Sequence, residues 1–164
     1  AAAKLLAMMD VEGAVELQSL IEKATPAFLA ERAARARRRI NVRTLMTQVA
    51  SSQVPLDDAL SRLIEEGNAL DLALGLSLVS GLPERQVTNA IVSVRMEPLA
   101  VICRALGVAT RIYVAADALR TATVRLPTAP PEILREAYEK LSPETAGRGL
   151  RFIKVRNTVA MGAP

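Results

Sequence analysis

The stretch over residues 68–110 constrains the fold most, because its hydrophobic residues recur with the 3.6-residue period of an α-helix. Gly81 and Gly107 interrupt it, and glycine readily takes the positive φ that ends many helices. Pro83 and Pro98 stand where two helices would begin, in the first turn that tolerates proline. The pattern predicts three consecutive helices: one that ends at Gly81, one over 83–94 and one over 99–106.

The helix predicted over 99–106, LAVICRAL, is apolar almost all the way round. Such a helix has to be covered by other elements on several sides. We therefore expect it to be a buried central helix. The side chains that we expect to be mostly buried are Leu99, Ile102, Cys103 and Leu106.

Two residues of this helix invite a functional interpretation. For Cys103 the apolar surroundings favour an inert buried thiol over a redox sensor, because Arg104 is the only basic residue close to it in the sequence. For Arg104 we favour a structural role, as a helix cap or as the partner of a carboxylate such as Asp71 or Glu97. Binding of an acidic ligand is the alternative.

The spacing of the helix starts suggests a repeat. Predicted starts near Leu56, Pro83 and Arg111 lie 27 and 28 residues apart, and second helices begin near Ala69 and Pro98. Each start opens a pair of helices, and pairs of this size cannot bury their own apolar faces. The sequence thus predicts an all-α fold, a helical-repeat stack of antiparallel helix pairs.

The N-terminal part is predicted to hold two helices. One covers residues 1–24, with a break near Asp10 as the alternative, and the next runs from Pro26 to Ala50 with Thr25 as its N-cap.

The C-terminal part is predicted to be helical as well. Thr110 is the expected N-cap of a helix over 111–124, and the proline-rich loop 126–131 separates it from two further helices. We divide the chain, as one continuous domain, into an N-terminal helical region with an arginine-rich helix (1–52), a helix-pair core (53–126) and a C-terminal helical pair (127–164).

Composition excludes several kinds of chemistry. The chain has no histidine and one cysteine, so it cannot form a histidine-dependent relay, a histidine-ligated metal site or a thiolate zinc site. Its adjacent acid pairs, Asp57-Asp58 and Glu65-Glu66, stand at the ends of a predicted helix, where such charges are ordinary. We expect no enzymatic activity, no cofactor and no metal.

The same composition bears on location. A single cysteine cannot form an internal disulfide, and no uncharged apolar run reaches the roughly 18–20 residues that span a bilayer. These features predict a cytoplasmic protein without a membrane span.

Positive charge concentrates in residues 31–43, which hold six arginines and one glutamate. At 100° per residue, four of them share one arc of about 80°; they are Arg32, Arg35, Arg39 and Arg43. An exposed stripe of this kind could bind nucleic acid, acidic lipid or an acidic protein. We favour the alternative, in which the arginines are solvated or pair with the protein's own acids, such as Glu12, Glu16, Asp57 or Asp58.

Two motifs carry a family resemblance: SGLP at 80–83 followed by Val87, and PLAVICRALG at 98–107. Over about residues 56–125 the chain resembles an uncharacterised, largely alphaproteobacterial family, a domain of unknown function with HEAT-like helical repeats. The resemblance implies a HEAT-like stack of helix pairs. It supplies no catalytic residue.

These observations favour a non-enzymatic helical-repeat module that serves as a protein–protein interaction or regulatory scaffold. Its partner would be another protein or a second copy of the chain. The alternative is a nucleic-acid or anionic-surface binder that uses the arginine stripe, with nucleic acid the less favoured partner.

Overall fold

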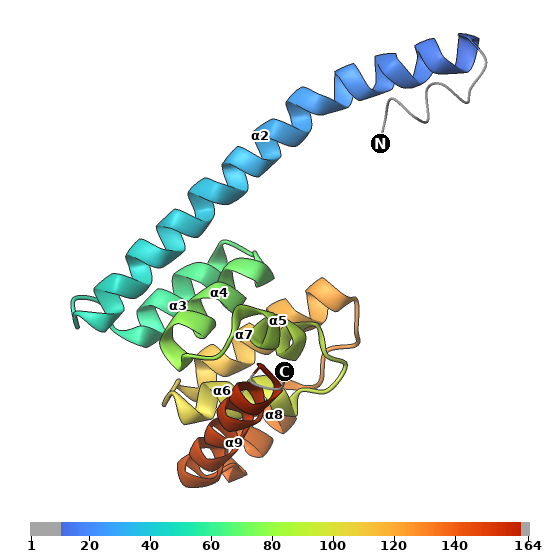
Figure 1. Ribbon diagram of the computed structural model, residues 1–164. Coiled ribbons are helices and arrows are strands. Elements are labelled where there is room, and N and C mark those ends of the chain that lie inside the picture. Colours follow the sequence, from blue (N-terminus) through green and yellow to red (C-terminus); the bar gives the residue numbers. More distant parts are fainter. Residues whose placement is uncertain (1–10, 162–164) are drawn as a thin grey trace. The chain divides into compact units, whose positions relative to one another are not determined.

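The computed structural model describes the backbone of residues 11–161 and the side chains of residues 25–155. Within that range the chain forms eight helices and no strand, which confirms the all-α prediction (Figure 1). The helices are α2 (Val11–Ala50), α3 (Leu56–Glu65), α4 (Ala69–Ser80), α5 (Glu84–Val92), α6 (Glu97–Ala105), α7 (Thr110–Val124), α8 (Pro131–Lys140) and α9 (Pro143–Met161).

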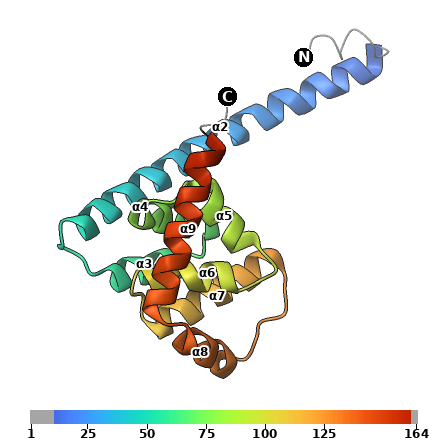
Figure 2. The same ribbon diagram turned by 60° about the horizontal axis from the view of Figure 1, so that its bottom comes forward.

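The chain divides into two compact units, Ala1–Ile40 and Asn41–Pro164. The first unit contains α2 up to Ile40. The second contains the end of α2 and all later helices, and Figures 1 and 2 show its helices running from α3 and α4 at one end to α8 at the other.

The predicted break at Thr25-Pro26 is wrong, because α2 continues through it and Pro26 lies inside the helix. Proline removes one backbone hydrogen bond from a helix interior. Here the residues on both sides are rich in alanine, leucine and glutamate, which favour the helical conformation.

The start of α7 also differs from the prediction. Ala109, not Thr110, is the N-cap, and it has no side-chain cap of its own. Instead the Ala109 N–H donates to Oδ1 of Asp57 in α3, at 3.1 Å. A carboxylate there also faces the positive end of the helix dipole. Asp57 therefore ties α3 to α7.

The core of the second unit is aliphatic and centres on α4. Eight of the twelve α4 residues are buried, including Leu72, Leu74 and Leu76. Gly75 lies so close to α3 that an added Cβ would stand 2.7 Å from Cδ1 of Leu63. The absence of a side chain at Gly75 lets the two helices approach each other.

The α6 prediction holds in most positions. Leu99, Ile102 and Cys103 are buried, whereas Leu106, just beyond the last helical residue Ala105, is half-buried. The helix α9 packs along α6 (Figure 2). Gly149 permits this contact, since an added Cβ would lie 3.2 Å from Cγ1 of Val101.

Two stacked tyrosines join α7 to α8. The rings of Tyr113 and Tyr138 are parallel within 8°, with centroids 4.2 Å apart. Tyr138 donates its hydroxyl hydrogen to the carbonyl of Val108 at 2.7 Å. Burial raises the pKa of both phenols well above the ordinary value of 10.0.

Candidate functional site

The four arginines predicted as an anion-binding stripe all lie on α2. Arg32 and Arg35 are exposed and Arg39 is half-buried in the first unit, and Arg43 is exposed in the second. The Arg32 guanidinium stands 5.9 Å from the ring centre of Phe28, a cation–π distance. Exposure is what an anion-binding role needs, but it also fits a solvated helix.

The acids proposed as internal partners of these arginines have different positions. Asp57 accepts a hydrogen bond from the Ala109 N–H at 3.1 Å, and Asp58 is exposed. Glu12 and Glu16 lie outside the described side chains. The pairing of the stripe with Glu12 and Glu16 stays a prediction.

Arg104 has the structural role that the sequence favoured, with a partner that the sequence could not identify. Its Nε donates to the carbonyl of Leu141 at 2.8 Å, at the C-terminal end of α8. Its guanidinium lies over the Tyr138 ring at 5.2 Å. Arg104 therefore fastens the end of α8 to α6.

Cys103 belongs to α6, and its side chain is buried. Burial, together with the negative charges of Asp117 and Asp57, raises the pKa of its thiol from 9.0 to about 12. A thiol with this pKa is protonated at neutral pH and a poor nucleophile.

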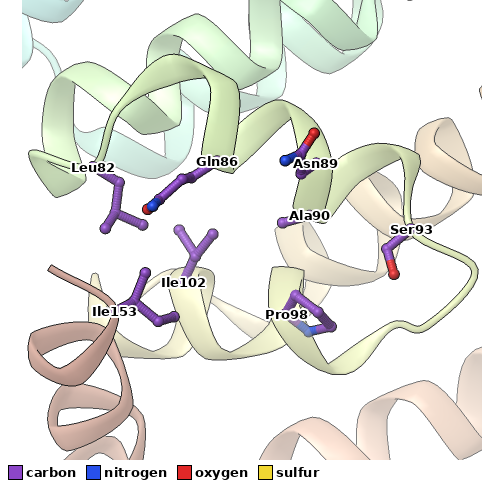
Figure 3. Close-up of a pocket in the computed structure, with 8 residues that line it drawn as sticks. All are labelled: Leu82, Gln86, Asn89, Ala90, Ser93, Pro98, Ile102 and Ile153. Carbon is purple, nitrogen blue, oxygen red and sulfur yellow. The ribbon is translucent and has the colours of Figure 1, made fainter. Parts of the chain in front are cut away.

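The second unit contains a cleft of about 300 Å³ between α5, α6 and the Ile153 region of α9, the α5–α6–α9 cleft (Figure 3). Leu82, Ile102 and Ile153 form an apolar wall around the side chain of Gln86, and Asn89 and Ser93 are the other polar residues of the lining. Oε1 of Gln86 is buried and has no hydrogen-bond partner among the described residues. The cleft therefore offers an apolar surface and one unmet acceptor, the usual composition of a binding pocket.

A second hollow lies between the end of α2 and α4. It measures about 560 Å³ and is lined mainly by aliphatic side chains, with Arg43 and Thr47 as its polar members. Leu78 beside it is 41% exposed. This surface suits an apolar segment better than a reacting substrate.

A buried ion pair is the main polar feature that the sequence prediction missed. Nε of Arg120 donates to Oδ1 of Asp117 at 2.7 Å, and both side chains are almost fully buried. The i, i+3 spacing on one helix is a signal that could have indicated the pair. Gln86 carries no comparable signal.

No group of three or more metal-binding side chains comes together among the described residues. None of the helices in the described part is long and apolar enough to cross a membrane.

Comparison with known protein families gives a match over most of the chain. Residues 1–151 match the model of a family described as an uncharacterised protein conserved in bacteria, DUF2336. Neither a curated protein nor a solved structure matches the chain.

Proposed function

The chain belongs to this bacterial family, and we propose that it is a non-enzymatic module that binds another protein, with a scaffolding or regulatory role. The observation that carries the proposal is the α5–α6–α9 cleft. An apolar side chain of the partner would fill the space between Leu82, Ile102 and Ile153, and a donor group of the partner would satisfy Gln86 Oε1.

We propose that the helices form a HEAT-like stack. In support, α4 and α6 begin at Ala69 and Glu97, 28 residues apart, and α3, α5 and α7 begin at similar intervals. Helices α3 and α7, of the first and third pairs, also contact each other. The stack is thus more closed than an open solenoid, in which each repeat touches only its neighbours. A cytoplasmic location fits such a module and stays a prediction.

Two matched variants on α9 test the cleft. Ile153→Arg places a charge in the cleft, whereas Val155→Arg places the same charge at a position that is 62% exposed and does not line it. Each variant and the unmodified chain would be used to capture proteins from a bacterium that carries the family, after circular dichroism has shown equal helicity.

We expect a partner that the unmodified chain and Val155→Arg retain and Ile153→Arg loses. Binding of that purified partner, measured by titration calorimetry, should weaken at least tenfold in Ile153→Arg, about 1.4 kcal/mol or more. Equal capture by both variants would contradict a role for the cleft.

The exposed arginines favour a second candidate, binding of an anionic partner such as nucleic acid or an acidic surface. Arg32, Arg35 and Arg43 are exposed, as a phosphate-binding stripe requires. The test is the double charge reversal of Arg35 and Arg39, with reversal of the exposed Arg111 and Arg135 as the control of equal net charge.

A salt titration with generic duplex DNA and with anionic vesicles supplies the readout. If the stripe binds phosphates, affinity falls steeply with salt, and the Arg35/Arg39 reversal abolishes binding while the control retains it. No binding at low salt removes this candidate.

A further inference from the structure

A second cleft, of about 280 Å³, has the buried Asp117–Arg120 pair in its lining. It lies between the segment that leads into α6, helix α7 and the α7–α8 connection with α8. Met96, Ala129 and Leu134 supply apolar walls, and the exposed Arg95 and Glu97 also line it. We call it the Asp117 cleft.

The ion pair uses only one of the two carboxylate oxygens of Asp117. Arg120 donates from Nε to Asp117 Oδ1 at 2.7 Å and from Nη1 to the carbonyl of Ser93 at 2.6 Å. These bonds fix the guanidinium and hold Oδ1. Oδ2 of Asp117 is buried without a hydrogen-bond partner among the described residues. A buried carboxylate oxygen is stabilised by a hydrogen-bond donor, so a ligand that contacts Asp117 here should carry a donor.

The surrounding charges restrict what that donor can be. Asp117 is balanced by Arg120, and Glu97 by Arg95, whose Nε lies 3.4 Å from Glu97 Oε2. An added cation would face two guanidinium groups, and an added anion would face the open Asp117 oxygen. A net-neutral donor meets neither penalty.

We propose that the Asp117 cleft binds a small, net-neutral molecule that donates an N–H to Asp117 Oδ2 and places an aliphatic group against Met96, Ala129 and Leu134. A primary carboxamide is the chemical class that fits best. Its N–H₂ supplies the donor, its charge is zero, and a branched aliphatic body suits a cleft of about 280 Å³. This site would give the protein-binding module a small-molecule ligand, independent of the α5–α6–α9 cleft.

Three probes with one aliphatic body separate the contributions. Isobutyramide has the donor, 3-methylbutan-2-one has the same shape with a methyl group in place of the N–H₂, and isobutyrate carries a negative charge. Binding would be followed by the NMR shifts of the Met96 and Leu134 methyl groups in the full chain. We expect isobutyramide to bind at least about tenfold more tightly than the ketone, because the ketone leaves Oδ2 unmet, and isobutyrate not to bind.

Variants locate the effect. In Asp117→Asn, Arg120 Nε should keep the amide oxygen on its side and turn the N–H₂ to the position of Oδ2, so the preference for isobutyramide over the ketone should disappear. Ala129→Leu fills the cleft without touching the pair and should abolish binding, whereas Ala122→Leu, at an exposed position of α7 outside the cleft, should leave it unchanged.

The proposal holds if the unmodified chain prefers isobutyramide and Ala129→Leu removes the binding, even where Asp117→Asn fails to fold. It is overturned if the ketone binds as tightly as the amide, if Ala129→Leu binds like Ala122→Leu, or if no probe shifts the two methyl groups up to its solubility limit. Failure of the Ile153→Arg test leaves these outcomes unaffected, because Ile153 does not line the Asp117 cleft.

Discussion

At the residue scale, the burial of Cys103 makes the stability of the fold depend on pH. Because burial raises the pKa of its thiol from 9.0 to about 12, the folded protein holds the proton more tightly than the unfolded chain. The resulting stabilisation is complete below about pH 9 and is lost as the pH rises towards about 12. Between these values the free energy of unfolding should fall by up to roughly 1.4 kcal/mol per pH unit.

Replacement of Cys103 by alanine should remove this part of the alkaline loss. Denaturant unfolding of both proteins between pH 8 and pH 11 gives the comparison, and the difference between the two slopes isolates the thiol from the tyrosines. Parallel slopes would contradict the raised pKa. The native thiol should likewise resist a thiol reagent at pH 8 until the protein is unfolded.

Leu99 and Leu106, at opposite ends of α6, test how the burial of a leucine side chain affects stability. Leu99 is fully buried and Leu106 half-buried. Leu99→Ala should lower the free energy of unfolding by about 2–5 kcal/mol through lost burial and a cavity, and Leu106→Ala by clearly less. Equal losses in chemical denaturation would mean that α6 is packed differently.

Single residues also show where prediction from sequence ends. Cys103 was predicted to lie in the core because its helix is apolar almost all the way round, and Arg104 was predicted to have a structural role because it is the one charge in LAVICRAL. The sequence could not identify the Leu141 carbonyl as the acceptor for Arg104, since the two residues lie 37 positions apart and meet only through packing. Periodicity assigns a face to a residue but not a neighbour.

At the element scale, two glycines on α9 provide a matched pair. A Cβ at Gly149 would lie 3.2 Å from Val101 Cγ1, whereas one at Gly147 would have only Arg151 Nη1 near it, at 4.0 Å. Gly149→Leu should push α9 away from α6 and cost about 1–3 kcal/mol. Gly147→Leu should be neutral or stabilising, because leucine favours a helix more than glycine does.

Hydrogen exchange measures this difference directly. Amides of α9 should exchange faster in Gly149→Leu than in the unmodified chain, and those of Gly147→Leu should not. Equal protection in the two variants would show that Gly149 is not needed for the contact.

The sequence predicted helix ends correctly where a glycine follows the helix, and it predicted helix starts wrongly where neighbouring or distant residues determine them. Gly81 and Gly107 end their helices with positive φ, and the breaks at these positions were predicted. Pro26 was predicted to start a helix and instead lies inside α2, because strong helix formers flank it. Thr110 was predicted as a cap, but Asp57, 52 positions before Ala109, supplies the acceptor.

At the scale of the whole molecule, the division after Ile40 predicts that residues 41–164 fold alone. This fragment holds the aliphatic core and both clefts. It should unfold in one cooperative transition with a midpoint close to that of the full chain. A fragment that lacks cooperative unfolding by circular dichroism would mean that the first 40 residues are required for the core.

The two clefts could not be predicted from the sequence, because the residues that line each of them are far apart in the chain. The α5–α6–α9 cleft joins residues from Leu82 to Ile153, and the Asp117 cleft joins residues from Val94 to Leu134. Each residue is ordinary in its own stretch of the sequence. Only the packing of distant helices leaves Gln86 Oε1 and Asp117 Oδ2 without a hydrogen-bond donor within the described part of the chain. The clustered arginines of α2, in contrast, are visible in the sequence itself.

The stack of Tyr113 on Tyr138 has a practical consequence for spectroscopy. The chain has no tryptophan and only these two tyrosines, so nearly all of its near-ultraviolet absorption and fluorescence comes from one pair of rings. Two aromatic rings whose centroids lie 4.2 Å apart couple electronically. Both rings lie at the contact between α7 and α8. The intrinsic optical signal of this protein is therefore a local reporter: it registers the parting of two helices, and it can change before or after the remaining helices melt.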